Sequence, residues 1–328
     1  MKKIRNMVWT KLARLIGIIF FLYLIWTADF YTLYDRWEKI SWLYIFPLPL
    51  LSVLMLTVRA ARWRLLLKAQ GVCITPRATW VTYAMGIFWG MVTPGRLGDL
   101  TKAFYVYERT GLDWPRSLSS AMVDRLLDII FMGLVAIWAV IYLDFSNRII
   151  ATILNSKFVF LSGLIFAVLL ILITMKYLFK DTEKSWFSFV SKLKIGVDDA
   201  KVMLKVAGWN CVLLTNMAYG LYFILTIFLA KSIMLPLGSL QVVAAIVLVG
   251  IASYLPISIA GLGTREAMLL LVMNQLKIEN GLELTLIFSS MFFVFCFVIP
   301  GSIGFICFWR QPISFFDFRK EMRRKLYG

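Results

Sequence analysis

The chain has 328 residues, of which 61% are hydrophobic and 16% are charged. Soluble domains average roughly 45–50% apolar and about 25% charged residues, so this composition excludes a water-soluble globular enzyme. The formal net charge of +17 does not indicate a nucleic-acid partner, because the charges lie between apolar segments and at both ends, as in membrane proteins facing an anionic leaflet.

Apolar runs of about 20 residues, most of them without charges, predict the membrane crossings, and the run at 117–143 carries charges in its first half. In chain order, we expect six transmembrane helices, over residues 10–28, 40–58, 117–143, 158–175, 206–230 and 284–309. Basic residues precede the first run, and the sequence after Trp26 is a poor cleavage site. We therefore interpret the first run as a retained signal anchor rather than a removed signal peptide.

Two further apolar stretches are interrupted and are predicted to form broken or re-entrant helical hairpins. The first covers residues 78–95 and continues as 97–107, and the second covers 239–259 and resumes as 266–275. Irregular backbone at membrane depth is tolerated only inside protein or beside a wet cavity. Proline and glycine weaken helices, so the predicted helix-break residues are Pro94, Gly95, Gly98, Pro256, Gly261 and Gly263.

The basic residues predict the orientation of the chain. They concentrate before the first crossing and in residues 59–77, 176–205 and 310–325. The basic residues in 59–77 are Arg59, Arg62, Arg64, Lys68 and Arg77. The positive-inside rule then places these groups and both termini on the cytoplasmic side of a prokaryotic cytoplasmic (inner) membrane.

The order of elements repeats. Residues 1–150 and 151–312 each read as span, span, broken hairpin, span, and a basic tail follows at 313–328. Because the halves begin on opposite sides of the membrane, we predict one transmembrane domain built from two inverted repeats. A pair of interrupted helices in such repeats is typical of a transporter with a site near the membrane midplane.

Charges at membrane depth predict where that site lies, since each costs roughly 2.5–3.5 kcal/mol on insertion and usually faces the protein interior. Helix N-termini at the two breaks would favour an anion, and arginine offers forked donors to phosphate. The predicted substrate-binding residues are Arg96, Asp99, Lys102, Asp124, Arg125, Asp128, Arg265 and Glu266. For Asp124, Arg125 and Asp128, a purely structural ion-pair network is an equal alternative.

The sequence offers little for metal or nucleophilic chemistry. It contains no histidine, which excludes His-dependent catalysis and the usual zinc and haem sites. The cysteines stand singly, without CxxC spacing, at Cys73, Cys211, Cys296 and Cys307. We expect no catalytic residues, no metal and no cofactor.

At these motifs the sequence resembles the flippase-like membrane domain of the lysylphosphatidylglycerol synthase/flippase superfamily. The resemblance covers nearly the whole chain and is carried by Arg62-Trp63, by residues 94–99 with Lys102, by 124–128, and by 255–258 with 261–266. The family usually has asparagine near Trp89, glutamate and arginine at Asp99 and Lys102, and glutamate at Asp124. The resemblance concerns the membrane part alone, so lipid aminoacylation is not expected.

The resemblance and the predicted site together favour a flippase or scramblase. Its expected partners are the membrane and lipids that are anionic or carry a linked phosphate, with a membrane enzyme as a further possible partner. Two alternatives stay open. One is a membrane-embedded enzyme acting on a lipid phosphate or lipid-linked sugar, with Asp99, Asp128 or Glu266 as general base. The other is a lipid-binding accessory protein that transports nothing.

Overall fold

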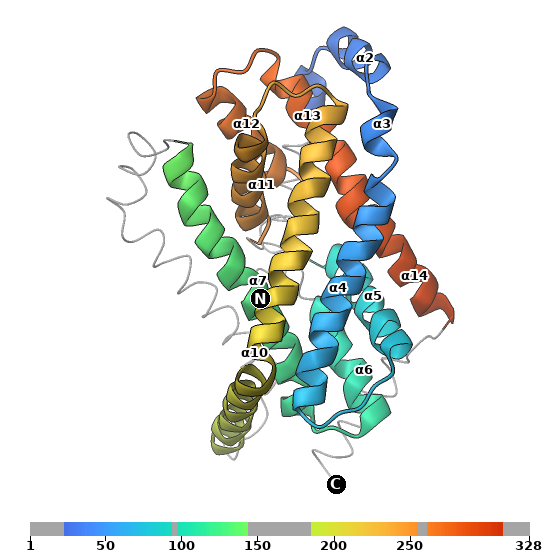
Figure 1. The fold of residues 1–328 in the computed structure, drawn as a ribbon, viewed down its shortest axis with the longest axis vertical. Coiled ribbons are helices and arrows are strands. Elements are labelled where there is room, and N and C mark those ends of the chain that lie inside the picture. The colour runs from blue at the N-terminus through green and yellow to red at the C-terminus, as the bar shows by residue number, and fades with distance from the viewer. Residues whose placement is uncertain (1–22, 94–97, 144–184, 255–260, 311–328) are drawn as a thin grey trace, which may run out of the picture.

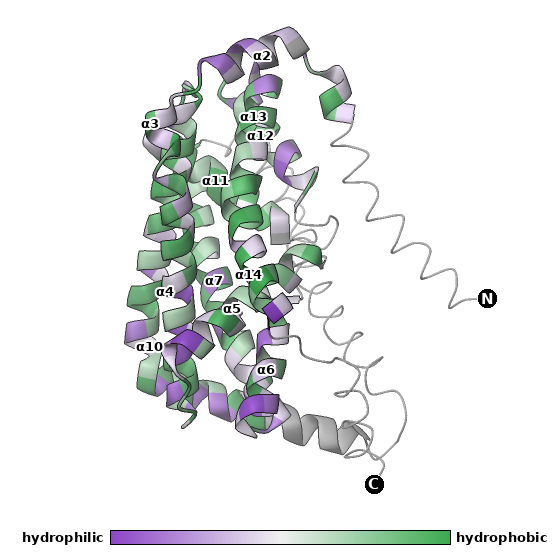
Figure 2. Ribbon diagram, turned by 90° about the vertical axis from the view of Figure 1, so that its right-hand side faces the viewer, coloured by the Kyte–Doolittle hydropathy of each residue, from purple (hydrophilic) through white to green (hydrophobic). Residues whose placement is uncertain are grey.

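The computed structural model describes residues 23–93, 98–143, 185–254 and 261–310. Within these ranges the regular structure is entirely helical. The longer helices run side by side along one axis (Figure 1), and hydrophobic residues predominate over most of their length (Figure 2). The predicted all-α fold of a membrane protein is therefore confirmed.

The first described helices are α2 (Phe30–Glu38), α3 (Trp42–Ile45) and α4 (Leu48–Ala69). Asp29 caps α2 by accepting the Tyr31 N–H at 3.0 Å and the Thr32 hydroxyl at 2.6 Å. These two bonds stabilise the carboxylate and hold the pKa of Asp29 below its usual value. The α2 helix lies across one end of the bundle (Figure 2).

Three helices complete the described part of the first half: α5 (Pro76–Val92), α6 (Thr101–Thr110) and α7 (Trp114–Tyr142). The Thr75 hydroxyl caps α5 by accepting the Ala78 N–H at 3.3 Å, and Pro76 occupies the first turn, where no N–H is needed. Gly111 ends α6 in the left-handed conformation with φ of 68°. The start of α5 and the end of α6 thus fall where the sequence supplies a cap.

The second half contains α10 (Ser185–Ser232), α11 (Ser239–Tyr254), α12 (Thr264–Gln275), α13 (Gly281–Phe293), a π-helical segment η3 (Val294–Val298) and α14 (Ile299–Arg310). The last three form one continuous rod (Figure 1). A π segment releases backbone carbonyls from the regular ladder. The Ser52 hydroxyl of α4 donates to the Phe295 carbonyl at 2.6 Å, so it ties this segment to the first half.

Four helices of the described ranges are long and apolar enough to cross a membrane, over Trp42–Ala69, Trp114–Tyr142, Ile195–Ser232 and Gly281–Arg310. They contain or nearly coincide with the predicted crossings at 40–58, 117–143, 206–230 and 284–309. The prediction at 158–175 lies outside the described residues, as does most of 10–28. The inverted repeat and the orientation in the membrane therefore stay predictions. The predicted basic tail at 313–328 also lies outside the described residues.

Both predicted breaks fall between helices. The α5 helix ends at Val92 and α6 begins at Thr101, while α11 ends at Tyr254 and α12 begins at Thr264. Gly261 and Gly263 have φ of 79° and 83°, a conformation that glycine adopts without strain. A Cβ atom at Gly98 would overlap the Trp89 carbonyl group, so this break also needs glycine. Pro94, Gly95, Arg96 and Pro256 lie outside the described residues.

The second predicted crossing ends too early. The charges that begin at Arg59 predict an end at residue 58, yet α4 continues to Ala69 and the side chain of Arg62 is fully buried. The prediction that grouped Arg62 with the charges of a cytoplasmic loop is therefore wrong. Its carboxylate partners, described below, allow this charge to lie inside the bundle.

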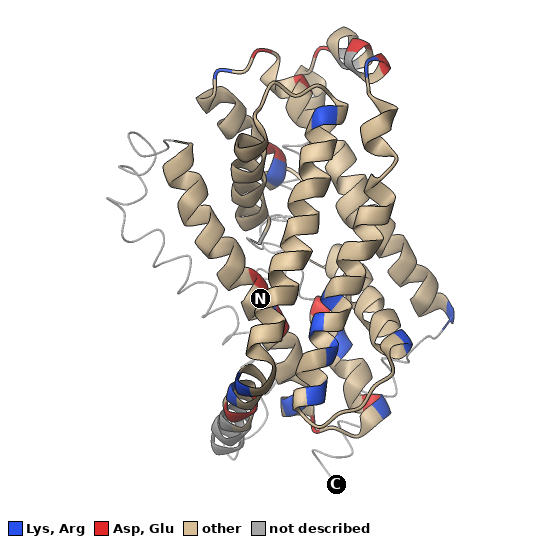
Figure 3. Cartoon of the chain, viewed as in Figure 1, with Lys and Arg blue, Asp and Glu red and all other residues tan. Residues whose placement is uncertain are grey.

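The core joins the two predicted halves. α10 packs along α4 and crosses α7, α11 packs on α7, and α14 packs on α5 (Figure 1). A Cβ atom at Gly304 of α14 would overlap the Ala84 carbonyl of α5, so these two helices approach closely. Most charged residues lie towards the ends of the molecule, but two groups lie deep within the bundle (Figure 3). These buried groups mark the candidate site.

Candidate functional site

Arg62 on α4 is the centre of the first buried group. Its Nε donates to Asp124 Oδ1 at 2.8 Å, and its Nη1 donates to Asp128 Oδ1 at 2.8 Å and to the Thr215 hydroxyl at 2.9 Å. Asp124 and Asp128 lie four residues apart on one face of α7, so a single guanidinium reaches both. Arg62 therefore connects α4, α7 and α10.

Lys102 on α6 approaches Asp124 from the other side. Its ammonium donates to Asp124 Oδ2, and the Tyr83 hydroxyl of α5 lies 3.2 Å from the same oxygen. The Lys102 nitrogen also lies 4.3 Å from the centre of the Tyr83 ring and 5.3 Å from that of Trp63. Each charge of the group thus has an opposite charge and several donors or aromatic faces around it, which offsets its desolvation.

This arrangement fits the structural alternative for Asp124 and Asp128. Both aspartate residues are 2% exposed or less, and the groups that bond their carboxylates come from three other helices, α4, α5 and α6. Removing one partner of a buried pair typically costs about 3–5 kcal/mol, because it leaves an uncompensated charge. We interpret Arg62, Lys102, Asp124 and Asp128 as the charged support on which the neighbouring cavity is built.

Arg125 and Asp99 form an ion pair beside this support. The side chain of Arg125 is 19% exposed, whereas that of Asp99 is 7% exposed. The carboxylate of Asp99 lies against Gly90 of α5, where a Cβ atom would overlap it. Glycine at position 90 therefore allows the break between α5 and α6 to bring Asp99 towards Arg125.

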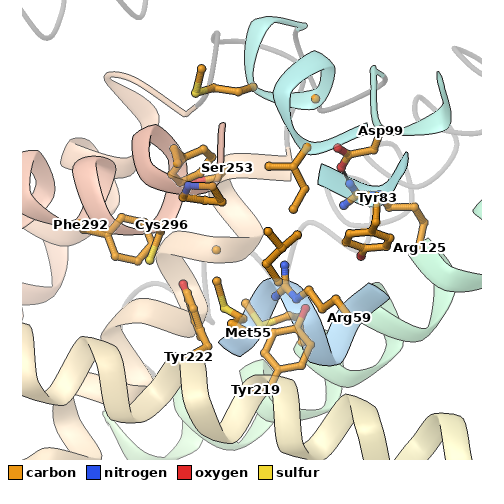
Figure 4. A pocket seen from close by; sticks show the side chains of 18 of the residues that line it. Met55, Arg59, Tyr83, Asp99, Arg125, Tyr219, Tyr222, Ser253, Phe292 and Cys296 are labelled. Atoms are coloured by element: carbon orange, nitrogen blue, oxygen red, sulfur yellow. Dashed lines mark ion pairs between the residues drawn. The ribbon is translucent and has the colours of Figure 1, made fainter. Parts of the chain in front are cut away.

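A cavity of about 80 Å³ lies next to this pair, in the middle of the bundle (Figure 4). The labelled lining residues of the first predicted half are Met55 and Arg59 of α4, Tyr83 of α5, Asp99 between α5 and α6, and Arg125 of α7, and those of the second are Tyr219 and Tyr222 of α10, Ser253 of α11, Phe292 of α13 and Cys296 of η3 (Figure 4). Elements of both predicted halves therefore form its wall. A volume of this size holds several water molecules.

Arg59 belongs to the cavity wall. Its guanidinium carbon lies 5.4 Å from the centre of the Tyr219 ring, so an aromatic face of α10 helps to hold the cation. In Figure 4 the Arg59 side chain lies beside Tyr219. Among the described residues around the cavity and its support, four are basic (Arg59, Arg62, Lys102, Arg125) and three are acidic (Asp99, Asp124, Asp128). The group therefore carries one positive charge in excess.

A second, smaller cavity of about 10 Å³ lies between Asp99 and Lys102, with Tyr83, Gly86, Ile87 and Arg125 also lining it. This is about the smallest space that accepts one water molecule. Asp99 lines both cavities.

The second buried group is Arg265, Glu266 and Ser289. Arg265 Nη2 donates to Glu266 Oε1 at 2.7 Å, and Arg265 Nε donates to the Ser289 hydroxyl at 2.5 Å. Glu266 Oε2 accepts the Gly263 N–H at 2.6 Å, which caps the start of α12. Nη1 of Arg265 has no hydrogen-bond partner among the described residues, although the side chain is 2% exposed.

The structure thus separates the predicted site residues into three sets. Asp99 and Arg125 line the central cavity, Lys102, Asp124 and Asp128 lie in or beside its support, and Arg265 and Glu266 form the second group. Arg96 lies outside the described residues. Sequence reasoning missed Arg59, Tyr219, Tyr222 and Ser253, and the position of Arg59 one residue after an apolar run was the available signal for it.

Comparison with known proteins gives one match. A family model described as the lysylphosphatidylglycerol synthase TM region matches residues 12–304, most of the 328-residue chain. The matched range includes both buried groups and the cavity. A search of curated proteins and a search of solved structures gave no match.

Proposed function

Because the chain belongs to the family of lysylphosphatidylglycerol synthase transmembrane regions, a group of membrane proteins with a lipid-related function, we propose that it is a lipid translocator. In this proposal it moves a phosphate-bearing polar lipid, or a lipid-linked glycan carrier, between leaflets of a prokaryotic cytoplasmic membrane. The long apolar helices make the chain a multi-pass membrane protein. Beyond membership of this membrane-protein family, what we propose is the identity of the substrate and its movement between leaflets.

The observation that carries the proposal is the central cavity. It lies between helices of both predicted halves, and Arg59 and Arg125 bring positive charge to its wall. Arginine suits phosphate oxygens because its donors form a planar fork, and an electrostatic contact strengthens in a site shielded from bulk water. The excess of one positive charge among the described residues around the cavity favours an anionic headgroup.

The proposed movement follows from where the cavity lies. The headgroup would enter between the halves 1–150 and 151–312 while the acyl chains stay in the bilayer. Rocking of one half against the other would then open the cavity to alternate sides. The sequence contains no nucleotide-binding motif, so movement would run downhill or be driven by an ion gradient.

Lipid translocation in proteoliposomes tests the proposal. Purified protein is reconstituted with a trace of fluorescent phospholipid, and a membrane-impermeant reductant reports how fast label reaches the outer leaflet. The double variant Arg59→Gln/Arg125→Gln should slow translocation by about tenfold or more, since a hydrogen bond to a charged group contributes about 1.5–3 kcal/mol.

The matched control is the double variant Arg64→Gln/Arg116→Gln, which also removes one positive charge from α4 and one from α7. Arg64 Nε donates to the Ile74 carbonyl at 2.9 Å, and Arg116 forms an ion pair with Asp199. Neither side chain lines the cavity. Equal rates in wild type and the cavity variant would contradict the proposal. Product formation from a lipid-linked donor would instead favour the enzyme alternative, and lipid binding without movement would favour the accessory one.

A further inference from the structure

Asp99 occupies the place at which the headgroup would bind. Its carboxylate is paired with Arg125, and both side chains line the central cavity. A phosphate that reaches Arg125 must therefore compete with a carboxylate of this chain. Resting on the proposed function, we propose that Asp99 is an internal competitor for Arg125, and that headgroup binding is linked to the uptake of a proton by Asp99.

The exchange is balanced in atoms and charge. The Arg125–Asp99 ion pair is replaced by an Arg125–phosphate ion pair, and the released carboxylate takes one proton from water in the cavity to become the neutral acid. No bond to phosphorus forms or breaks. The arginine keeps its charge throughout, because guanidinium groups remain protonated in proteins.

The surroundings of Asp99 favour this proton uptake. Asp99 is 5% exposed, so without Arg125 its charged form would lack both water and a counter-ion. A bound phosphate adds a second negative charge nearby, which disfavours the ionised carboxylate further. Asp99 also lines the smaller cavity beside Lys102, so water in either cavity is a source for the proton.

The other groups that face the two cavities do not compete for this proton. Arg59 and Arg125 stay charged, and lysine, tyrosine and cysteine ordinarily change protonation at higher pH than a carboxyl group. The titratable and charged groups in question are Arg59 on α4, Tyr83 on α5, Lys102 on α6, Arg125 on α7, Tyr219 and Tyr222 on α10 and Cys296 on η3. Asp99 is the only carboxylate among the described residues that line the cavities.

The sign of the pH dependence follows from the competition. At high pH Asp99 is ionised and holds Arg125, so the headgroup binds weakly. As the pH falls, Asp99 accepts a proton and releases Arg125, so binding tightens. With one linked proton, the affinity rises by at most about tenfold for each unit that the pH falls. A proton gradient would therefore favour loading of lipid on the more acidic side.

The experiment is calorimetric titration of the purified full chain in a neutral detergent, between about pH 5 and about pH 8, a range that spans partial to full ionisation of a perturbed carboxyl group. The probe is a short-chain, water-soluble glycerophospholipid with one phosphodiester charge. Heats measured at one pH in two buffers of different ionisation enthalpy give the number of protons taken up. Wild type should bind more tightly at low pH and take up as much as one proton for each lipid bound.

Asp99→Asn is the informative variant, because the amide keeps the shape of the side chain but neither holds Arg125 as an anion nor accepts a proton. It should bind the probe tightly at every pH, with no proton uptake. Asp35→Asn is the matched control, since Asp35 pairs with Lys39 in the exposed part of α2. This control should behave as wild type. The wild-type proton count tests the proposal even if Asp99→Asn does not fold.

The outcomes separate the two proposals. Probe binding by wild type without proton uptake, or uptake that persists in Asp99→Asn, would overturn the proton linkage alone. No binding at any pH would overturn the proposed function and the linkage with it. Dimethyl phosphate, which lacks acyl chains, is titrated in parallel. If it binds as tightly as the lipid, the lipid assignment fails while the proton linkage stands.

Discussion

The guanidinium carbon of Arg265 lies 5.7 Å from the centre of the Phe292 ring, and the same ring lines the central cavity. Phe292 therefore stands between the cavity and the second buried group. It also packs against Tyr222, Phe288 and Phe297, so this wall is a cluster of aromatic side chains. Its role can be tested by truncation.

Phe292→Ala should lower the free energy of unfolding by about 3–5 kcal/mol, since a large buried side chain is lost and a cavity remains. The measurement is unfolding in mixed micelles with increasing denaturing detergent. Phe305→Ala is the comparison on the same rod, because Phe305 is 44% exposed and loses less burial than Phe292, which is 4% exposed. Equal effects of the two substitutions would show that Phe292 is not part of a packed wall.

Arg62→Gln should destabilise the fold by about 3–5 kcal/mol, because Asp128 would lose its close cation and Asp124 one of two. Arg62→Lys should not restore stability, since Arg62 donates from three nitrogens to the Asp124 side chain, the Asp128 side chain and the Asp124 carbonyl, whereas lysine has one nitrogen. Lys39→Gln removes an exposed pair and should cost less than about 1 kcal/mol. A small effect of Arg62→Gln would mean that the buried group does not support the cavity.

Glu266→Gln should lower stability by about 1.5–3 kcal/mol, the range for hydrogen bonds to a charged group. The amide has one oxygen, so it cannot accept both from Gly263 and from Arg265 with Ser289. The same unfolding measurement applies, with Glu279→Gln at an exposed position as the control. Wild-type stability in Glu266→Gln would contradict a role for its charge in joining α12 to α13.

Gly304→Ala should destabilise the contact of α14 with α5 by about 1–3 kcal/mol, the usual cost of overpacking. The added methyl group would overlap the Ala84 carbonyl, and backbone yields less easily than a side chain. Gly133→Ala is the opposite case, because an added Cβ atom there has nothing within 4 Å. It should be neutral or stabilising by as much as about 1 kcal/mol, since alanine favours helix over glycine.

Among the described residues, the sequence predicts the four long apolar helices and both helix breaks, because apolar runs and Pro-Gly clusters are local signals. It fails at Arg62, where the first charge predicts the end of a crossing but α4 continues to Ala69. The partners that permit this charge, Asp124 and Thr215, are 62 and 153 residues away, and no local pattern reports such a distance. The sequence indicates Arg125 and Asp99 as site residues but not Arg59. The place of Arg59 in the cavity wall depends on packing against Tyr219 of another helix, and no local pattern reports that contact.

The bond from the Ser52 hydroxyl to the Phe295 carbonyl spans 243 residues and lies near the cavity wall formed by Met55 and Cys296. It fastens the widened turn of η3 to α4, which belongs to the other predicted half. An opening of the cavity along this seam must break the bond, whereas an opening along α7 and α11 leaves it intact. The proposed rocking of residues 151–312 against residues 1–150 would therefore have to break this bond, because α4 and η3 lie in different predicted halves.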